Sequence, residues 1–112
     1  MKSGTCFIDM SSINPVDSRY IGKILKEKEI EMLDAPVSGG EPKAIDGTVA
    51  FMVGGDENTF EKYKEILFKM GSSVTRCGEL GAGNTTKLAN QIIVAGNIQA
   101  VSEAFILQKG RC

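Results

Sequence analysis

The first third of the chain alternates between apolar runs and a helical repeat. Thr5 to Asp9 is a short apolar run that predicts a buried strand, and Ile30 to Val37 predicts a second one. Between them, Asn14 followed by Pro15 is typical of a helix start. The apolar residues of this helix recur at helical spacing: Val16, Tyr20, Ile21, Ile24 and Leu25. Strand, helix and strand form one βαβ unit, which favours a right-handed crossover and a parallel sheet.

The middle of the chain continues with shorter elements. Glu41 to Asp46 predicts a short helical turn, and Thr48 to Val53 predicts a third strand. Asp56 is expected to cap a helix that ends at Gly71. The apolar face of that helix holds Phe60, Tyr63, Leu67 and Met70. Ser73 to Cys77 then predicts a fourth, weaker strand, so the fold class is α/β.

The final segment is apolar on almost every side. We expect a helix from about Gly83 to Lys109, because apolar residues occur all round it from Leu88 to Leu107. Its longest uncharged stretch, Leu88 to Ser102, is shorter than the roughly 18 residues of a membrane-spanning helix, so we interpret it as buried. The other predicted elements cover only one of its faces. We therefore expect a second domain or a partner subunit to enclose the rest.

The composition narrows the chemistry. The chain has 112 residues, of which 42% are hydrophobic and 24% charged, values that fit one globular domain. It has no histidine, which excludes a Ser-His triad, a Cys-His dyad and histidine-bound zinc, and we expect no metal. The net charge of −1 gives no electrostatic footprint for nucleic acid or an anionic membrane. A small-molecule or protein partner is favoured.

The cysteines indicate a reducing compartment. Cys6, Cys77 and Cys112 are odd in number and widely spaced, which predicts reduced, unpaired thiols in a cytoplasmic protein. Cys6 and Cys77 also fit the role of small buried hydrophobic residues. The N-terminus has no apolar run long enough for a signal peptide, so we do not expect export.

Two polar loops follow the predicted strands, at the edge where parallel sheets bind their ligands. One loop holds Ser11 and Ser12, and the other holds Ser38, Gly39 and Gly40. A hydroxyl and two backbone amides without side chains can grip a carboxylate closely. Most such triplets are ordinary turns, so position alone leaves both interpretations open.

Lys87 stands near the start of the last helix among amide side chains. Asn84 precedes it by three residues, and Asn90 and Gln91 follow it by three and four, which brings all four residues onto one helical face. A lysine that is partly desolvated there becomes a usable acid or base. The alternative is a solvated lysine near a helix start.

Two further motifs have structural interpretations. The glycines of GELGAG lie between a strand and a helix, but their order departs from GxGxxG and no acidic residue follows about 20 positions later on a second strand. We interpret this segment as a flexible entry to the last helix. Asp9 and Asp34 lie near strand ends, where aspartates usually bond neighbouring backbone amides.

Four blocks, in this order and at these separations, resemble one family: IDMSSINP, LDAPVSGGEPKAIDGT, FMVGG and GELGAGNTTKLANQ. From about Gly4 to Lys109 the chain is similar to the β-hydroxyacid dehydrogenases, which are 6-phosphogluconate dehydrogenase-like. The resemblance implies a Rossmann-like fold and an oxidoreductase that uses NAD or NADP. Within the family, the GEPKAIDG stretch favours the reduction of tartronate semialdehyde to glycerate.

The resemblance also implies roles for individual residues. Lys87 matches the family's catalytic acid/base, which protonates the carbonyl oxygen as hydride arrives. The Ser38–Gly40 loop matches the loop that holds the substrate carboxylate, and Asn90 matches an asparagine that orients the substrate. Ser12 matches a position near the nicotinamide end of the cofactor.

The family pattern extends beyond both ends of the matched blocks. Its members open with a strand and a GxGxxG loop, and they continue past the long helix into an all-helical domain. We therefore expect residues 4–80 to be the second half of a Rossmann-like domain and residues 81–112 to be an interdomain helix. On this interpretation the chain is a piece with little activity alone, and the full-length protein is a homo-oligomer.

Two other interpretations remain. The serine-glycine loop and the lysine are shared across the family, so the substrate can be another β-hydroxyacid such as 3-hydroxyisobutyrate. In a different class, the chain is a non-catalytic module that associates through its apolar last helix, because an uncovered apolar helix is an adhesive surface.

Overall fold

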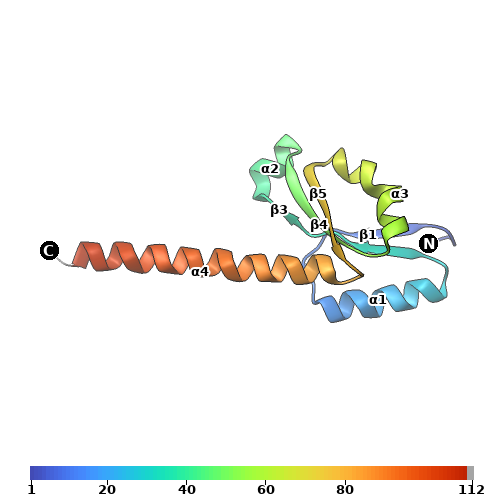
Figure 1. The fold of residues 1–112 in the computed structure, drawn as a ribbon, viewed down its shortest axis with the longest axis horizontal. Coiled ribbons are helices and arrows are strands. Elements are labelled where there is room, and N and C mark those ends of the chain that lie inside the picture. Colours follow the sequence, from blue (N-terminus) through green and yellow to red (C-terminus); the bar gives the residue numbers. More distant parts are fainter. Residues whose placement is uncertain (111–112) are drawn as a thin grey trace.

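The computed structural model describes residues 1–110, which form one five-stranded sheet and four helices (Figure 1). In chain order the elements are β1 (Cys6–Asp9), α1 (Pro15–Glu27), β2 (Glu31–Asp34), β3 (Val37–Ser38), α2 (Gly40–Asp46), β4 (Val49–Gly54), α3 (Glu57–Phe68), β5 (Gly71–Gly78) and α4 (Ala82–Gly110). The α/β class predicted from the sequence is confirmed.

The two predicted helix caps are confirmed. The Asn14 side chain accepts a hydrogen bond from the Val16 amide at 2.9 Å, and Pro15 is the first residue of α1. The Asp56 carboxylate accepts hydrogen bonds from the amides two and three residues further on, at 3.0 and 3.2 Å. These caps satisfy amides that have no partner inside the helix, and so they set where α1 and α3 begin.

The buried face of α1 differs from the predicted one. Ser18 and Gly22 are buried, whereas Val16, Tyr20 and Ile24 are exposed. The reason is a close approach of the helix to its neighbours, because a Cβ at Gly22 would contact Leu80 and the Met32 sulfur. Small residues therefore line the contact, and three of the five apolar residues face outward.

Gly71 does not cap α3, which ends at Phe68. It opens β5 instead, and this strand is longer at both ends than the predicted Ser73–Cys77. A Cβ at Gly71 would lie 2.9 Å from the Phe51 ring and within 2.5 Å of the Val49 carbonyl oxygen. The position needs glycine for lack of space rather than for a left-handed backbone.

The apolar run from Ile30 to Val37 is two strands rather than one. The Ala35 amide still donates to the Asp9 carbonyl of β1 at 2.7 Å, but the Pro36 carbonyl accepts from the Met52 amide of β4 at 3.0 Å. The chain changes partner at this point, from β1 in parallel register to β4 in antiparallel register. The strand order is β1-β2-β4-β3 with β5 on β4, so parallel pairing holds only for β1–β2 and β4–β5.

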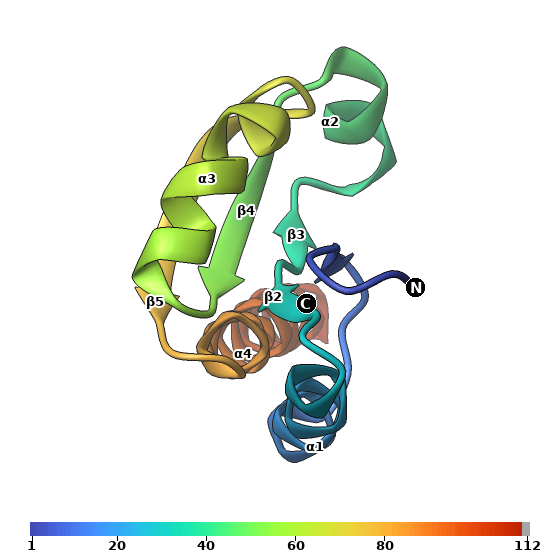
Figure 2. The same cartoon turned by 90° about the vertical axis from the view of Figure 1, so that its right-hand side faces the viewer.

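The core lies between the sheet and α3. Figure 2 shows α3 running along β4 and β5, with α1 and the start of α4 grouped at the other end of the molecule. Alternate residues of β4 enter the core, as the period of a strand requires. The buried cluster consists of Leu33, Ala35, Val49, Phe51, Val53, Phe60 and Leu67.

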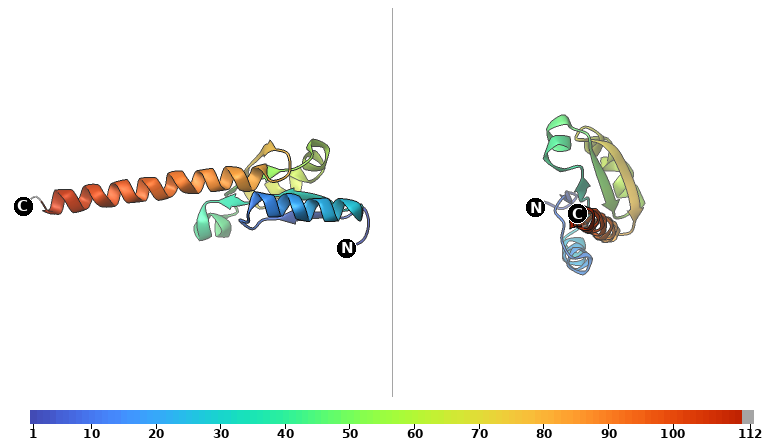
Figure 3. Two further views of the ribbon diagram at one scale, coloured as in Figure 1. Left: turned by 90° about the horizontal axis from the view of Figure 1, so that it is seen from below. Right: turned by 90° about the vertical axis from the view of Figure 1, so that its left-hand side faces the viewer.

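Helix α4 extends away from the sheet, as Figures 1 and 3 show, and it accounts for the 66 Å length of the molecule. The sequence predicts that the other elements of this chain cover only one face of the helix, and from Thr85 to Gly110 every residue is exposed except Lys87 and Asn90. The large apolar side chains left open are Leu88, Ile92, Ile93, Val94, Ile98, Val101, Phe105, Ile106 and Leu107. In the described part of the chain, no helix combines the length and hydropathy needed to cross a membrane.

Two of the three cysteines lie within the described residues. Cys6 and Cys77 are free thiols, as predicted, while Cys112 lies outside the described range. Burial raises the pKa of the Cys6 thiol to about 11, with a further increase from the Glu31 carboxylate and an opposing effect from Lys62. At neutral pH Cys6 is therefore protonated and a poor nucleophile.

Candidate functional site

The serine loop after β1 lies at the carboxyl edge of the parallel strands, as predicted. The ends of β1 and β2 meet there through the hydrogen bond from Ala35 to Asp9. The Asp9 carboxylate accepts from the Ser11 amide at 3.0 Å and also from the Ser11 hydroxyl. Asp9 thus has the local structural role expected of it, and Ser12 is left exposed at the edge of the sheet.

The Ser38–Gly40 loop joins the end of β3 to α2. Ser38 is half-buried, and both glycines are exposed with left-handed backbone angles, φ 132° at Gly39 and 66° at Gly40. A Cβ at Gly39 would also lie 2.6 Å from the Cβ of Lys43. Glycine is needed at both positions for the chain to turn from β3 into α2 with its amides uncovered.

Lys87 and Asn90 share the inner face of α4. Both are half-buried, and they are the only residues after Asn84 in the described part of the helix with this status. The four residues predicted on one face therefore differ in exposure. Asn84 is buried, Lys87 and Asn90 are half-buried, and Gln91 is exposed. Spacing brought the pair together, but it did not show which way each side chain faces.

Asp34 makes contacts that its sequence position did not predict. Its side chain is fully buried at the end of β2. The carboxylate accepts hydrogen bonds from the amides of Gly81 at 2.8 Å and Asn84 at 2.7 Å, 47 and 50 residues further along the chain. Backbone amides are its partners, as expected, but they are distant amides at the start of α4. No local sequence signal identifies this pairing.

Asn84 extends the same network towards α1. Its side-chain nitrogen donates to the Ser18 hydroxyl at 2.9 Å, and its side-chain oxygen accepts from the Ile13 amide at 3.2 Å. Both Asn84 and Ser18 are buried, so the network has no contact with solvent. It connects β2, α1, α4 and the loop that carries Ser12.

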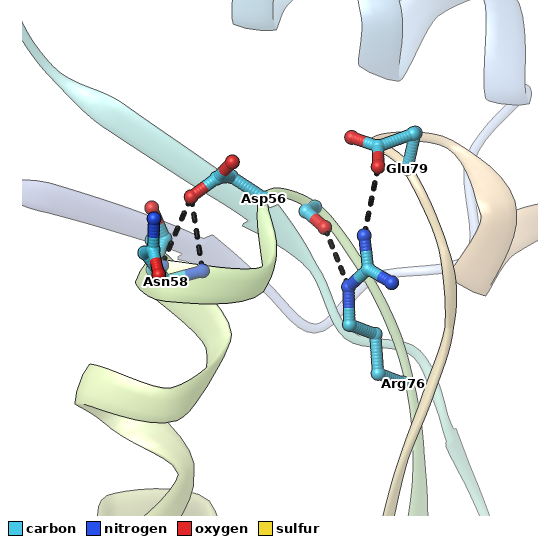
Figure 4. A network of polar contacts seen from close by, with 6 residues as sticks. Asp56, Asn58, Arg76 and Glu79 are labelled. Carbon is cyan, nitrogen blue, oxygen red and sulfur yellow. Dashed lines mark hydrogen bonds and ion pairs between the residues drawn. The ribbon is translucent and has the colours of Figure 1, made fainter.

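The GELGAG segment is tied down rather than flexible. The Gly55 amide donates to the Gly78 carbonyl at 3.0 Å, and the Ala82 amide donates to the Glu79 carbonyl at 2.9 Å. Figure 4 shows Arg76 joining this segment to the turn after β4, because its Nε donates to the Gly55 carbonyl at 3.0 Å and its guanidinium pairs with Glu79 at 2.8 Å. The sequence reasoning missed Arg76, although an arginine and a glutamate three residues apart across a turn signal such a pair.

The start of α4 does not fit a dinucleotide phosphate. In a phosphate-binding loop the free amides at a helix start face the anion. Here the amides of Gly81 and Asn84 instead donate hydrogen bonds to the carboxylate of Asp34, so they are not free to bind a phosphate. Ser12, which the family resemblance places near the nicotinamide end of the cofactor, lies exposed beyond β1, at the carboxyl edge of the sheet.

The candidate residues lie around one end of the sheet. Figures 1 and 2 both place β3 and α2 above the first part of α4, which carries Lys87. Among the described residues, no hydrogen bond joins Ser12, the Ser38–Gly40 loop and Lys87 to one another. The arrangement offers a primary amine, hydroxyls and uncovered backbone amides, which suit a small carboxylate-bearing ligand.

Comparison with known proteins gives a consistent result. The family described as the NAD binding domain of 6-phosphogluconate dehydrogenase matches residues 1–78. The chain is 48% identical over 103 residues to 2-hydroxy-3-oxopropionate reductase of Escherichia coli (strain K12), covering 92% of the chain and 35% of that protein. It is 39% identical over 106 residues to 2-(hydroxymethyl)glutarate dehydrogenase of Eubacterium barkeri, covering 95% of the chain and 35% of that protein.

A solved structure shows the same fold. The 3-hydroxyisobutyrate dehydrogenase of Mycobacterium tuberculosis, determined with L-serine, superposes with a TM-score of 0.91 at 40% identity, covering 95% of this chain and 36% of that one. The chain thus spans about a third of the length of the relatives it matches. The family match covers more than half of the chain, and the chain belongs to the 6-phosphogluconate dehydrogenase-like family of β-hydroxyacid dehydrogenases.

Proposed function

We propose that this chain is the catalytic segment of an enzyme that reduces tartronate semialdehyde to glycerate with NADH or NADPH. The observation that carries the proposal is the half-burial of Lys87 and Asn90, alone on an otherwise exposed stretch of helix. The identity of 48% to a 2-hydroxy-3-oxopropionate reductase supports the choice of substrate. In a chain without histidine, Lys87 supplies the proton to the carbonyl oxygen that is being reduced.

The substrate's carboxylate is assigned to the Ser38–Gly40 loop. Its two glycines present backbone amides without side chains, and the Ser38 hydroxyl adds one more donor. Asn90 lies one helical turn beyond Lys87 on the same inner face and orients the substrate's polar groups. With its carboxylate bound by the Ser38–Gly40 loop and its carbonyl placed at Lys87, a short hydroxyacid binds in one orientation.

When bound, the nicotinamide cofactor supplies the hydride. Ser12 is assigned to its nicotinamide end, next to the carboxyl ends of β1 and β2. The pyrophosphate is assigned to a part of the enzyme that precedes the matched blocks, because Asp34 takes the amides at the start of α4. The cofactor's affinity for this chain alone is accordingly low.

The proposed domain organisation follows the burial pattern. Residues 4–80 form the second half of a Rossmann-like domain, and residues 81–112 form the helix that leads to a further domain. The exposed apolar side chains along α4 support the presence of a covering partner, since a solvated helix of this composition is unfavourable. We assign that cover to the rest of the subunit and to a second subunit of a homo-oligomer.

A graft tests the function. Residues 4–110 of this chain replace the matching segment of the E. coli reductase, and cofactor oxidation is followed with tartronate semialdehyde. We expect turnover by the graft and a loss of about 10²- to 10⁴-fold in kcat for Lys87→Met, the contribution typical of a general acid. Lys109→Met, an exposed lysine on the same helix, is the matched control and keeps full turnover. Turnover that survives Lys87→Met would contradict the proposal.

The second candidate substrate is 3-hydroxyisobutyrate. It is favoured by the TM-score of 0.91 and the identity of 40% to a dehydrogenase with that name. Comparing kcat/KM of the graft for tartronate semialdehyde and for oxidation of 3-hydroxyisobutyrate separates the two. A higher value for 3-hydroxyisobutyrate would replace the proposed substrate and leave the role of Lys87 intact.

A further inference from the structure

The start of α4 is anchored by a carboxylate that the proposed chemistry does not use. Asp34 has no exposed surface, and its two oxygens each accept a hydrogen bond from one backbone amide, that of Gly81 just before α4 and that of Asn84 in its first turn. Among the described residues, the ion pairs are Lys64 with Glu61 and Arg76 with Glu79, so no cation pairs with Asp34. The carboxylate is stabilised by the amides and by the positive end of the helix dipole. This arrangement fixes two points of the first turn.

Two glycines make the anchor rigid. A Cβ at Gly83 would lie 2.6 Å from the Asp34 carbonyl oxygen and closer still to that of Met52. A Cβ at Gly54 would lie 2.8 Å from the Gly83 amide and closer still to the Asp34 carboxylate. The first turn of α4 therefore sits directly on the backbones of β2 and β4, and no flexible side chain lies between them to absorb a shift.

Asn84 links the anchor to the rest of the candidate site. Its side chain is 1% exposed and uses both of its polar atoms, one on Ser18 of α1 and one on the Ile13 amide. Ile13 directly follows Ser12, the residue assigned to the nicotinamide end of the cofactor. Lys87 follows Asn84 by three residues, a rise of about 4.5 Å along the helix. Asn84 is thus a buried residue that links Lys87 to the Ser12 loop, the two parts of the proposed site that must face each other.

The covered part of α4 is short. Its buried and half-buried residues all lie between Ala82 and Asn90, where the helix contacts β2, β4, β5 and α1, and every described residue beyond Asn90 is exposed. The direction of the helix is therefore set by these first residues, and the hydrogen bonds to Asp34 and Ser18 lie at their start. Loosening that turn moves Lys87 relative to the sheet edge. A displacement of about 1 Å in a reacting group can cost about 10²-fold in rate.

We propose that Asp34, Asn84 and Ser18 form a positioning network that holds Lys87 at a fixed place relative to the Ser12 loop and the end of β2. The proposal rests on the role proposed above for Lys87. The three residues touch neither substrate nor cofactor. They act through the first turn of α4, and their loss allows the helix to tilt while the sheet stays folded.

Spin labels on the full chain test the anchor without reference to activity. Labels are placed at Glu65→Cys on α3 and Ala95→Cys on α4, both exposed, in a background whose native cysteines are replaced by alanine. We expect one narrow distance peak in the parent and a broad distribution in Asp34→Asn. Asp56→Asn is the matched control, because it alters an aspartate that also caps a helix with two amides, and it leaves the peak narrow. A narrow peak in Asp34→Asn overturns the proposal.

A nuclear magnetic resonance titration connects the anchor to Lys87. Tartronate, with NAD added, is the probe, and the side-chain signals of Lys87 and Asn90 are followed in the graft of residues 4–110 into the E. coli reductase, which supplies the rest of the cofactor site. We expect Asp34→Asn to weaken tartronate binding by about tenfold or more and Asp56→Asn to leave it unchanged. Unchanged affinity and unchanged Lys87 signals in Asp34→Asn overturn the positioning role, since a purely structural residue would not move them in a folded variant.

Two further variants keep the outcome decisive. If Asp34→Asn does not fold, Ser18→Ala leaves both backbone hydrogen bonds of Asp34 in place and removes only the partner of Asn84. It is expected to broaden the spin-label distances, and an unchanged peak contradicts the network. Lys87→Met is expected to abolish the tartronate-induced shifts. If the parent graft shows no shifts at all, the proposed function fails, and the spin labels still decide whether Asp34 anchors α4.

Discussion

Helices α3 and α4 begin with the same chemistry, an aspartate carboxylate that accepts hydrogen bonds from two backbone amides. In α3 the cap is Asp56, which is exposed and bonds the amides two and three residues ahead. In α4 the cap is Asp34, which has no exposed surface and bonds Gly81 and Asn84, 47 and 50 residues away. A local cap sets only where a helix begins. A distant cap also sets where the helix lies against the sheet.

Because Asp34 is buried and Asp56 is exposed, the two caps contribute unequally to the free energy of unfolding. The Asn58 amide gains water when Asp56 is lost, because Asn58 is exposed, whereas Thr59 is buried. Amides that lose Asp34 have no replacement partner, since Gly81 and Asn84 are buried as well. An unsatisfied buried group carries its full desolvation cost, which an exposed one does not. The predictions below follow this difference, beginning with the largest expected effect.

Replacing Asp34 by alanine should cause the largest loss of stability. Hydrogen bonds to a charged group contribute about 1.5–3 kcal/mol each, so losing two buried ones lowers the free energy of unfolding by about 3–6 kcal/mol. Urea unfolding of the full chain, followed by circular dichroism, measures the change. Asp9→Ala is the matched control at the end of the neighbouring strand, and its bonds to Ser11 are exposed. A loss below about 1 kcal/mol in Asp34→Ala would show that the buried cap is not a major source of stability.

Adding one methyl group to Gly83 should have the next largest effect. The new Cβ would meet two backbone carbonyl oxygens, which cannot move aside as a side chain can, and we expect a loss of about 3 kcal/mol. Gly96 is the matched control on the same helix, with no atom within 4 Å of an added Cβ. Gly96→Ala should raise stability by up to about 1 kcal/mol through helix propensity. A similar response to both substitutions in thermal unfolding would contradict the close contact at Gly83.

The sequence predicted what depends on neighbours along the chain. The caps at Asn14 and Asp56 were found because cap and amide lie within three residues of each other. Lys87 and Asn90 were placed on one face because their spacing matches a helical turn. In each case the residues concerned lie within one helical turn of each other along the chain, so the local sequence pattern contains both of them.

What the sequence did not predict depends on contacts between distant segments. Asp34 was expected to bond nearby amides, and only the folded chain brings Gly81 and Asn84 to it. The break at Ala35–Pro36 has the same origin, because the strand changes partner where β4 arrives from further along the chain. The pairing of Asp34 leaves no local signature, whereas Pro36, which has no amide to donate, marks the break in the strand. The candidate residues Ser12, Ser38 and Lys87 could be named from the sequence, but the network behind them could not.

Replacing Asn84 by alanine should have an intermediate effect on stability, because it removes only the side-chain hydrogen bonds at the start of α4. The substitution keeps the backbone amide that Asp34 binds, but it leaves the Ser18 hydroxyl and the Ile13 amide without their partner. We expect a loss of about 2 kcal/mol. In a double-mutant cycle with Ser18→Ala, the combined loss should be smaller than the sum of the single losses, because both substitutions remove the same hydrogen bond. Additive losses in urea unfolding would show that the two residues act independently.

Asp56→Ala should have the smallest effect of the series. An exposed N-cap contributes about 1 kcal/mol, and here water replaces the carboxylate at the exposed Asn58, whereas Thr59 is buried. Asp56→Ser should recover most of the loss, since a hydroxyl also caps a helix. Asp34→Ser should recover little, because Gly81 and Asn84 bind different oxygens of the Asp34 carboxylate, and serine has a single oxygen on a shorter side chain. Equal losses in Asp56→Ala and Asp34→Ala would mean that the range and burial of a cap do not matter. The two helix starts would then differ in the position of the capping aspartate but not in its contribution to stability.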